Sequence, residues 1–188
     1  MATVLHLRKE LARPPVALAL AGIDVRTMRV PDDVPVWLAL RDRATAELRP
    51  RPRRWTELDF ASQMLNQPWW RDDRTWLAIA ASQRLAGSES PATRSLPAID
   101  SVHPKIVGSV TLAVREATVN NVPVLHWLMV DPSWRRRGIA RVLVSHLERA
   151  AWNAGWREVQ LETHAGWKDA VAFYQSMGYA PVRERSPR

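Results

Sequence analysis

The sequence contains no cysteine, which excludes a disulfide framework, a thiolate metal site and a cysteine nucleophile. A reducing compartment is the simplest environment for such a chain, so a cytoplasmic location is expected. No apolar run approaches the roughly 20 residues that span a bilayer. The short apolar segment 16–22 follows a charged stretch and leads directly into patterned sequence. We therefore interpret it as a strand or arm and not as an export signal.

Lysine is also scarce. Only Lys9, Lys105 and Lys168 are Lys among the 27 cationic residues, in a chain of 188 residues with a net charge of +8. Half of this net charge comes from the segment Arg41 to Arg54, in which six Arg accompany two acidic residues. A basic patch indicates an acidic partner, which could be nucleic acid, a phosphate-bearing cofactor or an acidic substrate. Composition alone does not choose among these three.

The hydrophobic pattern predicts one mixed α/β domain over residues 23–188, preceded by an N-terminal arm or extra strand over residues 1–22. We expect strands over 23–30, 74–81, 105–116, 122–130 and 159–164. We expect helices over 34–48, 56–65 and 139–154, and a final helix ending at Gly178. Residues 82–104 are expected to form a long loop, and Asn120-Asn121 a tight turn between antiparallel strands. Most of the ten Trp are expected in the core.

The segment from Val130 to Val144 is the most informative, because a predicted strand there turns into a predicted helix. The first turn of such a helix has unpaired amide donors and a positive dipole end, so it can hold a pyrophosphate. The small residues Gly138 and Ala140 would permit close approach of the phosphates. Four cationic residues would add charge-assisted contacts: Arg135, Arg136, Arg137 and Arg141. The Arg-rich turn on its own would equally fit an ordinary turn with a solvated basic face.

Two strings of residues then resemble a known family. Val130 to Ala140 reads V-x-P-x-x-R-x-x-G-x-A and resembles the acyl-CoA signature of the GCN5-related N-acetyltransferase (GNAT) superfamily. Leu161 to Tyr179 resembles the strand, helix and Gly-aromatic ending that follow in that family. The motifs are closest to those of ribosomal-protein-alanine acetyltransferase-like members. The resemblance implies an α/β fold with a mostly antiparallel central sheet, splayed between two strands and flanked by about four helices.

The resemblance also implies acetyl-CoA as co-substrate, with no metal. Main-chain atoms of Leu128, Met129 and Val130 would contact the pantetheine arm, and residues 135–140, including Ile139, would contact the pyrophosphate. The amide near Leu128 would polarise the thioester carbonyl, which is an oxyanion-hole role. The acceptor amine would attack directly in a ternary complex, without a covalent enzyme intermediate.

Three residues are candidates for the proton transfers that such a reaction requires. Tyr174 matches the family's general acid and is also expected at the cofactor, although a Tyr beside Phe173 is as often only part of a core. Glu162 and His126 are alternative general bases; His126 is expected on the same strand face as Leu128. Trp167 occupies the position where many members have an Asn that helps to bind the cofactor, so stacking could replace a polar contact there.

The end of the chain departs from the family, because only nine residues follow Tyr179. Residues 180–185 could supply one strand of the usual terminal hairpin. The missing strand is expected from residues 14–22 or from a second subunit, which leaves a homodimer as an open alternative.

The expected acceptor is a small-molecule or peptide amine, and no membrane partner is expected. Arg49, Arg51, Arg53 and Arg54, with Trp55, Trp69 and Trp70 nearby, would suit an acidic or aromatic acceptor. A solvated loop beside core tryptophans is the favoured interpretation of this segment. Two other functions stay open. A non-catalytic acyl-CoA sensor ranks second, and a basic nucleic-acid-binding protein ranks last because no nucleic-acid motif is present.

Overall fold

The computed structural model of this chain describes residues 3–81, 105–115 and 122–182. The strands are β1 (Val4–Glu10), β2 (Ile23–Thr27), β3 (Thr75–Ala80), β4 (Lys105–Arg115), β5 (Val122–Val130), β6 (Glu158–His164) and β7 (Ala180–Pro181). The helices are α1 (Val34–Ala44), α2 (Glu57–Phe60), α3 (Ile139–Asn153) and α4 (Lys168–Ser176). The expected loop 82–104, the expected turn 120–121 and residues 183–185 lie outside the described residues.

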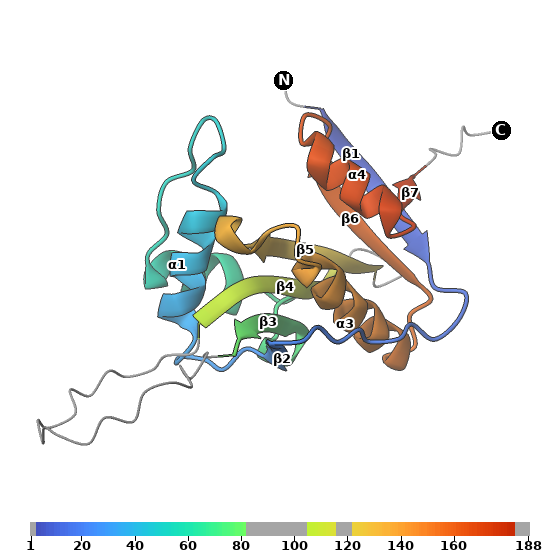
Figure 1. Cartoon of the computed structure of the whole chain (residues 1–188), viewed down its shortest axis with the longest axis horizontal. Helices are drawn as coiled ribbons and strands as arrows, with labels where there is room; N and C mark the ends of the chain where they lie inside the picture. Colours follow the sequence, from blue (N-terminus) through green and yellow to red (C-terminus); the bar gives the residue numbers. More distant parts are fainter. Residues whose placement is uncertain (1–2, 82–104, 116–121, 183–188) are drawn as a thin grey trace, which may run out of the picture.

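The strands form one seven-stranded sheet in the order β2-β3-β4-β5-β6-β1-β7 (Figure 1). Every neighbouring pair is antiparallel except β5 and β6, which are parallel. The predicted α/β fold with a mostly antiparallel sheet and four helices is therefore confirmed.

Helices cover both faces of the sheet, so the protein has two apolar cores. One core contains Leu143 and Leu147 of α3 and Tyr174 of α4, and the other contains Trp37 of α1 and Phe60 of α2. The strand β3 contributes to both cores, because alternate residues of a strand point to opposite faces. Its residues Trp76, Ala78 and Ala80 pack in the α3 core, and Leu77 and Ile79 pack in the α1 core. A sheet buried on both faces explains why all six residues of this strand are apolar or Thr.

The N-terminal segment supplies a strand that the sequence analysis placed elsewhere. β1 lies between β6 and β7 and pairs with β6 from Val4–His164 to Glu10–Glu158. The prediction that residues 14–22 provide the missing strand is wrong. Residues 15–18 cross α3 instead, where the Leu18 amide donates to Ser145 Oγ at 2.9 Å. Since the chain's own residues fill this position, a second subunit is not needed to complete the sheet.

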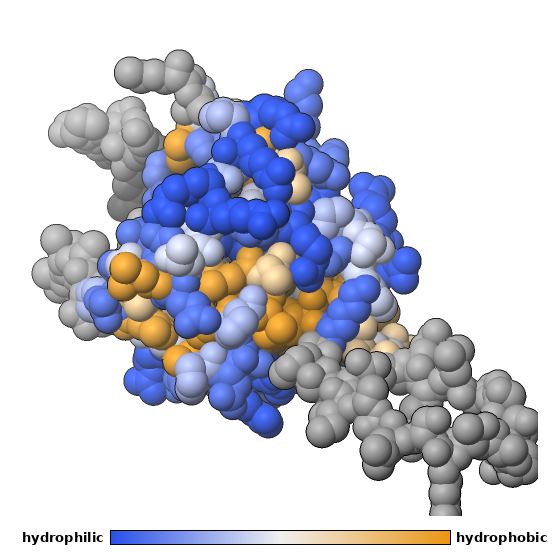
Figure 2. Space-filling view, turned by 90° about the vertical axis from the view of Figure 1, so that its left-hand side faces the viewer, coloured by the Kyte–Doolittle hydropathy of each residue, from blue (hydrophilic) through white to orange (hydrophobic). Residues whose placement is uncertain are grey.

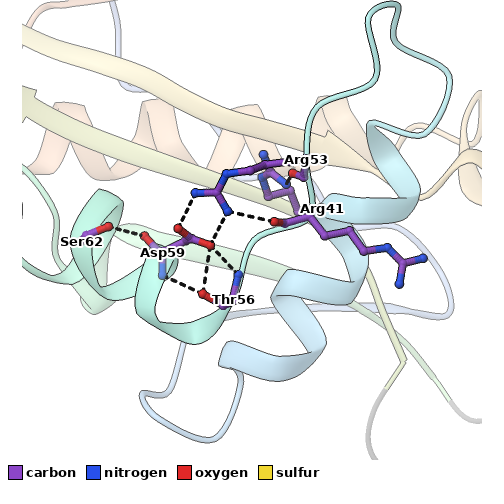
Figure 3. Close-up of polar contacts among 6 residues, drawn as sticks. Arg41, Arg53, Thr56, Asp59 and Ser62 are labelled. Atoms are coloured by element: carbon purple, nitrogen blue, oxygen red, sulfur yellow. Dashed lines mark hydrogen bonds and ion pairs between the residues drawn. The ribbon is translucent and has the colours of Figure 1, made fainter.

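Two predicted helices have different ends in the structure. α1 ends at Ala44, four residues earlier than predicted, where the Thr45 hydroxyl donates back to the Arg41 carbonyl at 2.9 Å. The predicted helix 56–65 consists of the short α2 and a π-helical turn over 61–65. A capping box begins α2, since Thr56 Oγ1 accepts from the Asp59 amide and Asp59 Oδ2 accepts from the Thr56 amide (Figure 3). None of the helices in the described part of the chain is long and apolar enough to cross a membrane.

Nine of the ten tryptophans belong to or pack against one of the two cores, as predicted, although only two are buried. Trp37 and Trp76 are buried, seven others are half-buried at the edges of the two cores, and Trp167 is 45% exposed. Large indole rings rarely become fully buried even when they pack against a core. Trp167 alone among the ten belongs to neither core.

Candidate active site

A cleft lies where two parallel strands separate. β5 and β6 pair only at Val124 and Gln160, and beyond that point the strands diverge (Figure 1). The side chains around this divergence enclose a cleft of about 510 Å³. Eight of the predicted site residues line it: His126, Leu128, Met129, Val130, Arg135, Glu162, Trp167 and Tyr174. The splay expected from the family resemblance is therefore present and places these residues around one space.

A β-bulge shapes the β5 wall of the cleft. Ser109 pairs with Met129 and Thr111 pairs with His126, so Trp127 and Leu128 together face one residue of β4. Trp127 has a φ of 50°, an uncommon conformation for a bulky residue. A bulge redirects backbone and side-chain groups. The alternation that placed His126 and Leu128 on one face does not continue across it, although both residues line the cleft.

The turn before α3 contains the predicted phosphate site. A short 3-10 turn over Pro132–Trp134 separates β5 from α3, so the strand does not run directly into the helix as expected. Gly138 precedes α3 with a φ of +87°, which strongly favours glycine. A Cβ at Gly138 would meet nothing within 4 Å in the described structure. The space beside Gly138 is therefore not filled by described protein atoms, so a phosphate could approach the first turn of α3 there.

Asp131 holds this turn in place. Its carboxylate accepts from the Ser133 amide at 3.0 Å and from Arg43 Nε of α1 at 2.7 Å. Burial alone would raise the pKa of Asp131, but the hydrogen bonds from Ser133 and Arg43 outweigh this effect and lower it. The carboxylate is thus ionised at neutral pH and ties α1 to the start of the phosphate turn.

The predicted phosphate-binding arginines point in several directions. Arg135 lines the cleft, and its Nη2 donates to the Ala44 carbonyl of α1 at 3.1 Å. The Arg137 guanidinium lies over the Trp134 ring at 4.8 Å, and Arg141 Nη2 donates to Ser176 Oγ at 3.3 Å.

Two other predicted contacts, Arg136 and Ile139, lie in different environments. Arg136 is exposed with a φ of 62°, and the Ile139 side chain is buried in the core. Ile139 can therefore offer only its backbone to a phosphate, whereas Arg135 is the Arg side chain already at the cleft.

Tyr174 lies on the α4 wall of the cleft and is 9% exposed. Its ring packs against Tyr179 with centroids 6.0 Å apart. Burial raises the pKa of Tyr174 to about 12, because the phenolate would lose its hydration there. The hydroxyl consequently keeps its proton at neutral pH, which is the state that a general acid needs.

The two candidate bases lie on opposite walls of the cleft. Glu162 of β6 alternates with the core residue Leu161, so its carboxylate points to the face away from α3 and lies 3.9 Å from His6 Nδ1 of β1. His126 of β5 packs against Trp69 and Trp127, with ring centroids 5.1 and 5.4 Å apart. Each residue faces the space into which an acceptor would enter.

Among the cleft residues that the sequence analysis did not predict, three are informative. His164 lies two positions after Glu162 on the same face of β6, and its ring meets Trp167 edge-on at 4.6 Å. The alternation of β6 was a signal that could have identified His164. Val4 lines the cleft because β1 pairs with β6, and Leu48 lines it from the segment after α1. Both depend on long-range packing that the sequence pattern did not indicate.

The Arg-rich segment after α1 is largely engaged with the protein's own groups (Figure 3). Arg53 binds both carboxylate oxygens of Asp59, at 2.6 and 2.7 Å, and Arg54 lies 3.4 Å from Asp42. The hydrogen bond from Arg53, together with those from Thr56, holds the pKa of Asp59 far below its ordinary value. This arrangement supports the interpretation of a solvated loop and leaves less free charge for an acidic partner than the sequence indicates.

Comparisons with known proteins agree with this geometry. Residues 40–179 match the model of the acetyltransferase (GNAT) family. N-acetyltransferase 8 from Homo sapiens is 40% identical over 77 residues, which cover 40% of this chain and 34% of that protein. The match thus spans about a third of the length of this curated relative.

Solved structures share the fold at lower identity. A GCN5-related N-acetyltransferase from Sphaerobacter thermophilus has a TM-score of 0.69 and 20% identity, over 95% of this chain and 48% of that chain. The ribosomal-protein-S18-alanine N-acetyltransferase of Escherichia coli has a TM-score of 0.56 and 20% identity, over 88% of this chain and 84% of that chain. The aminoglycoside N-acetyltransferase AAC(6')-Iy in complex with CoA has a TM-score of 0.57 and 22% identity, over 91% of this chain and 98% of that chain. The splayed sheet, the glycine turn before α3 and the family match over most of the chain together show that this protein is an acyltransferase of the GNAT family.

Proposed function

We propose that this protein transfers the acetyl group of acetyl-CoA to a primary amine by direct attack in a ternary complex. The observation that carries the proposal is one continuous cleft. It brings Arg135, from the turn before the open amide end of α3, together with Glu162, His126 and Tyr174. A cofactor site and an acceptor site can therefore meet without movement of the sheet.

The residues present fit acetyl-CoA. Gly138 leaves room for a pyrophosphate at the start of α3, and Arg135 stands beside it with a fixed positive charge. Main-chain groups of Leu128, Met129 and Val130 would contact the pantetheine arm on the wall of β5 that faces away from β4. Acetyl-CoA supplies a thioester, whose acyl carbon is open to attack by an amine. Trp167, which lines the cleft together with Tyr174, would be a further contact for acetyl-CoA.

The chain's own residues would perform two proton transfers. Glu162 or His126 would accept a proton from the acceptor ammonium, since each faces the cleft. Tyr174, which is protonated at neutral pH, would donate a proton to the departing thiolate. It would regain a proton from the acceptor nitrogen, which loses its second proton as the amide forms. The Leu128 amide, redirected by the bulge, would polarise the carbonyl under attack.

Calorimetric titration of the purified protein with acetyl-CoA and with CoA tests the cofactor assignment without knowledge of the acceptor. Stoichiometric binding in the micromolar range is expected at two salt concentrations. A thiol-release assay with a panel of primary amines then tests transfer. Binding without transfer to any amine would support the acyl-CoA sensor, and absence of binding at either salt concentration would overturn the proposal.

A further inference from the structure

The charge around the cleft limits what the acceptor can be. Glu162 is the one acidic residue among the described residues that line the cleft. Two other carboxylates, Glu47 and Asp131, lie outside this lining and bind Arg135 and Arg43. Glu162 itself lies 3.9 Å from His6 Nδ1. An acceptor with several positive charges would therefore find one carboxylate, in a chain that itself carries a net charge of +8.

The remaining wall of the cleft is aromatic and apolar. His164 and Trp167 form an edge-to-face pair on the β6 side, and Trp127 lies on the β5 side. Leu48 and Val4 line the cleft from outside these two strands. Figure 2 shows that hydrophobic residues also gather in a band on the side of the molecule that faces left in Figure 1, where α1 lies. Such a surface favours an apolar or aromatic substituent, because burial of that substituent removes apolar area from water.

We propose that the acceptor is an amine with a single positive charge and an aromatic or apolar substituent. Its ammonium group would lie toward Glu162, and its substituent would lie against the rings of His164 and Trp127. Polyamines and aminoglycosides are poor acceptors, because their additional ammonium groups would lose their hydration in the cleft and would not gain a carboxylate partner there. The inference rests on the proposed acetyl transfer and names the acceptor class of that same site.

A comparison of three acceptors tests the inference. The rate of CoA release at saturating acetyl-CoA is measured with 2-phenylethylamine, spermidine and kanamycin. The kcat/KM for 2-phenylethylamine is expected to exceed the other two by at least about tenfold, the scale of discrimination that a hydrophobic pocket provides. Equal or greater kcat/KM for spermidine or kanamycin would overturn the inference.

A charge swap at the cleft provides a second test. His164→Glu places a second carboxylate two residues from Glu162 on the same face of β6. The ratio of kcat/KM for spermidine to that for 2-phenylethylamine is expected to rise about tenfold, since one added ion pair at a partly buried site supplies this scale of energy. His164→Gln is the matched control, because it removes the imidazole without adding charge and so measures how far loss of the ring alone changes the ratio. The ratio is expected to be about tenfold higher in His164→Glu than in His164→Gln, which isolates the effect of the added carboxylate. Equal ratios in the two variants, with acetyl-CoA binding intact, would contradict the inference.

The same experiment separates this inference from the proposed function. If acetyl-CoA binds calorimetrically but no amine of the wider panel is acetylated, acetyl transfer itself has failed and the acceptor class falls with it. If spermidine or kanamycin is acetylated efficiently, acetyl transfer stands and only the acceptor class is wrong.

Discussion

The guanidinium of Arg135 donates a hydrogen bond to the carboxylate of Glu47, 88 residues earlier in the chain, with Nη1 and Oε2 2.5 Å apart. This contact joins the segment after α1 to the turn before α3. In the proposed complex, the same guanidinium would bind a phosphate of acetyl-CoA. Glu47 therefore competes with the negatively charged phosphates of the cofactor for the guanidinium of Arg135.

Glu47→Gln should consequently tighten acetyl-CoA binding, by about three- to tenfold at low salt, because a neutral amide competes less well for Arg135. Calorimetric titration with acetyl-CoA measures the change. Glu57→Gln, which removes an exposed carboxylate on α2, is the control and should leave the affinity unchanged. An affinity for Glu47→Gln equal to that of wild type would show that Arg135 does not bind the cofactor phosphates.

Gly138→Glu should abolish acetyl-CoA binding, because it places bulk and negative charge in the open space before α3. Gly155 offers a closely matched control at the other end of the same helix, since it also has a positive φ, of 91°, and open space around it. Gly138→Glu and Gly155→Glu should each lower the free energy of unfolding by about 1–2 kcal/mol, because both place a side chain on a left-handed backbone. Only Gly138→Glu should prevent binding; loss of binding in both variants would mean that the effect comes from the fold.

Tyr174→Phe should lower kcat about ten- to a thousandfold with near-normal acetyl-CoA affinity, the range expected for loss of one general acid. Tyr179→Phe makes the same chemical change one residue after Gly178, at a buried Tyr that does not line the cleft, and should leave kcat nearly unchanged. Because the pKa of Tyr174 is about 12, wild-type kcat should show no loss from its ionisation below pH ~10. An unchanged kcat in Tyr174→Phe would remove this residue from the mechanism.

Asp33 links the end of β2 to α1 through two hydrogen bonds from Arg26, at 2.6 and 2.8 Å, and one from the Arg29 amide at 2.7 Å. Burial alone would raise the pKa of Asp33, but these hydrogen bonds lower it overall. A lowered pKa stabilises the fold at a pH above the unfolded value of about 4, and this stabilisation is lost as the pH falls through the folded pKa.

Asp33→Asn should therefore lower the free energy of unfolding by about 2 kcal/mol at pH 7. The difference from wild type should begin to shrink as the pH falls below ~4, where unfolded Asp33 takes up a proton, and should continue to shrink until the pH lies below the lowered pKa of folded Asp33. Urea denaturation at several pH values measures this dependence. Asp32→Asn, at the exposed neighbouring position, should change stability little at any pH. A difference that stays constant with pH would show that the ionised carboxylate is not the stabilising form.

Lys9 of β1 binds both carboxylate oxygens of Glu148 of α3 at 2.8 Å, and Glu148 is only 3% exposed. Lys9→Met should lower the free energy of unfolding by about 3–5 kcal/mol, because it leaves a buried charge without its partner. The double variant Lys9→Met with Glu148→Met should recover most of this loss. Thermal or urea denaturation measures both effects, with the exposed Lys168→Met as control. Equal stability of the single and double variants would argue against a stabilising ion pair.

The sequence allowed prediction of those parts of the site that depend on local features. The turn at Gly138 contains the residue type that most readily adopts a positive φ, and Tyr174 was predicted from the resemblance to the GNAT family, on a helix that the hydrophobic pattern indicates. Both lie within the stretch that resembles the GNAT family. The strand predicted over 74–81 is also confirmed, and its residues alternate between the two cores.

Other features depend on contacts between distant segments and were not predicted. The bulge at Trp127 arises from its register against β4 and has no residue signal of its own. The pairing of Arg135 with Glu47 joins two charged residues that look solvent-exposed in the sequence. In β1, Leu5 and Leu7 do alternate with polar residues, but only a partner about 150 residues later makes that short pattern a strand.

The position of β1 has a consequence for how the protein folds during synthesis. β1 is synthesised about 150 residues before its partner strand, which extends from Glu158 to His164, so β1 cannot pair until that later strand is available. Pairing at such sequence distance is slow, because a large loop must close before any contact forms. The β6 side of the cleft, to which Val4 and His6 belong, is therefore completed late, after α1, α2 and α3 have been synthesised.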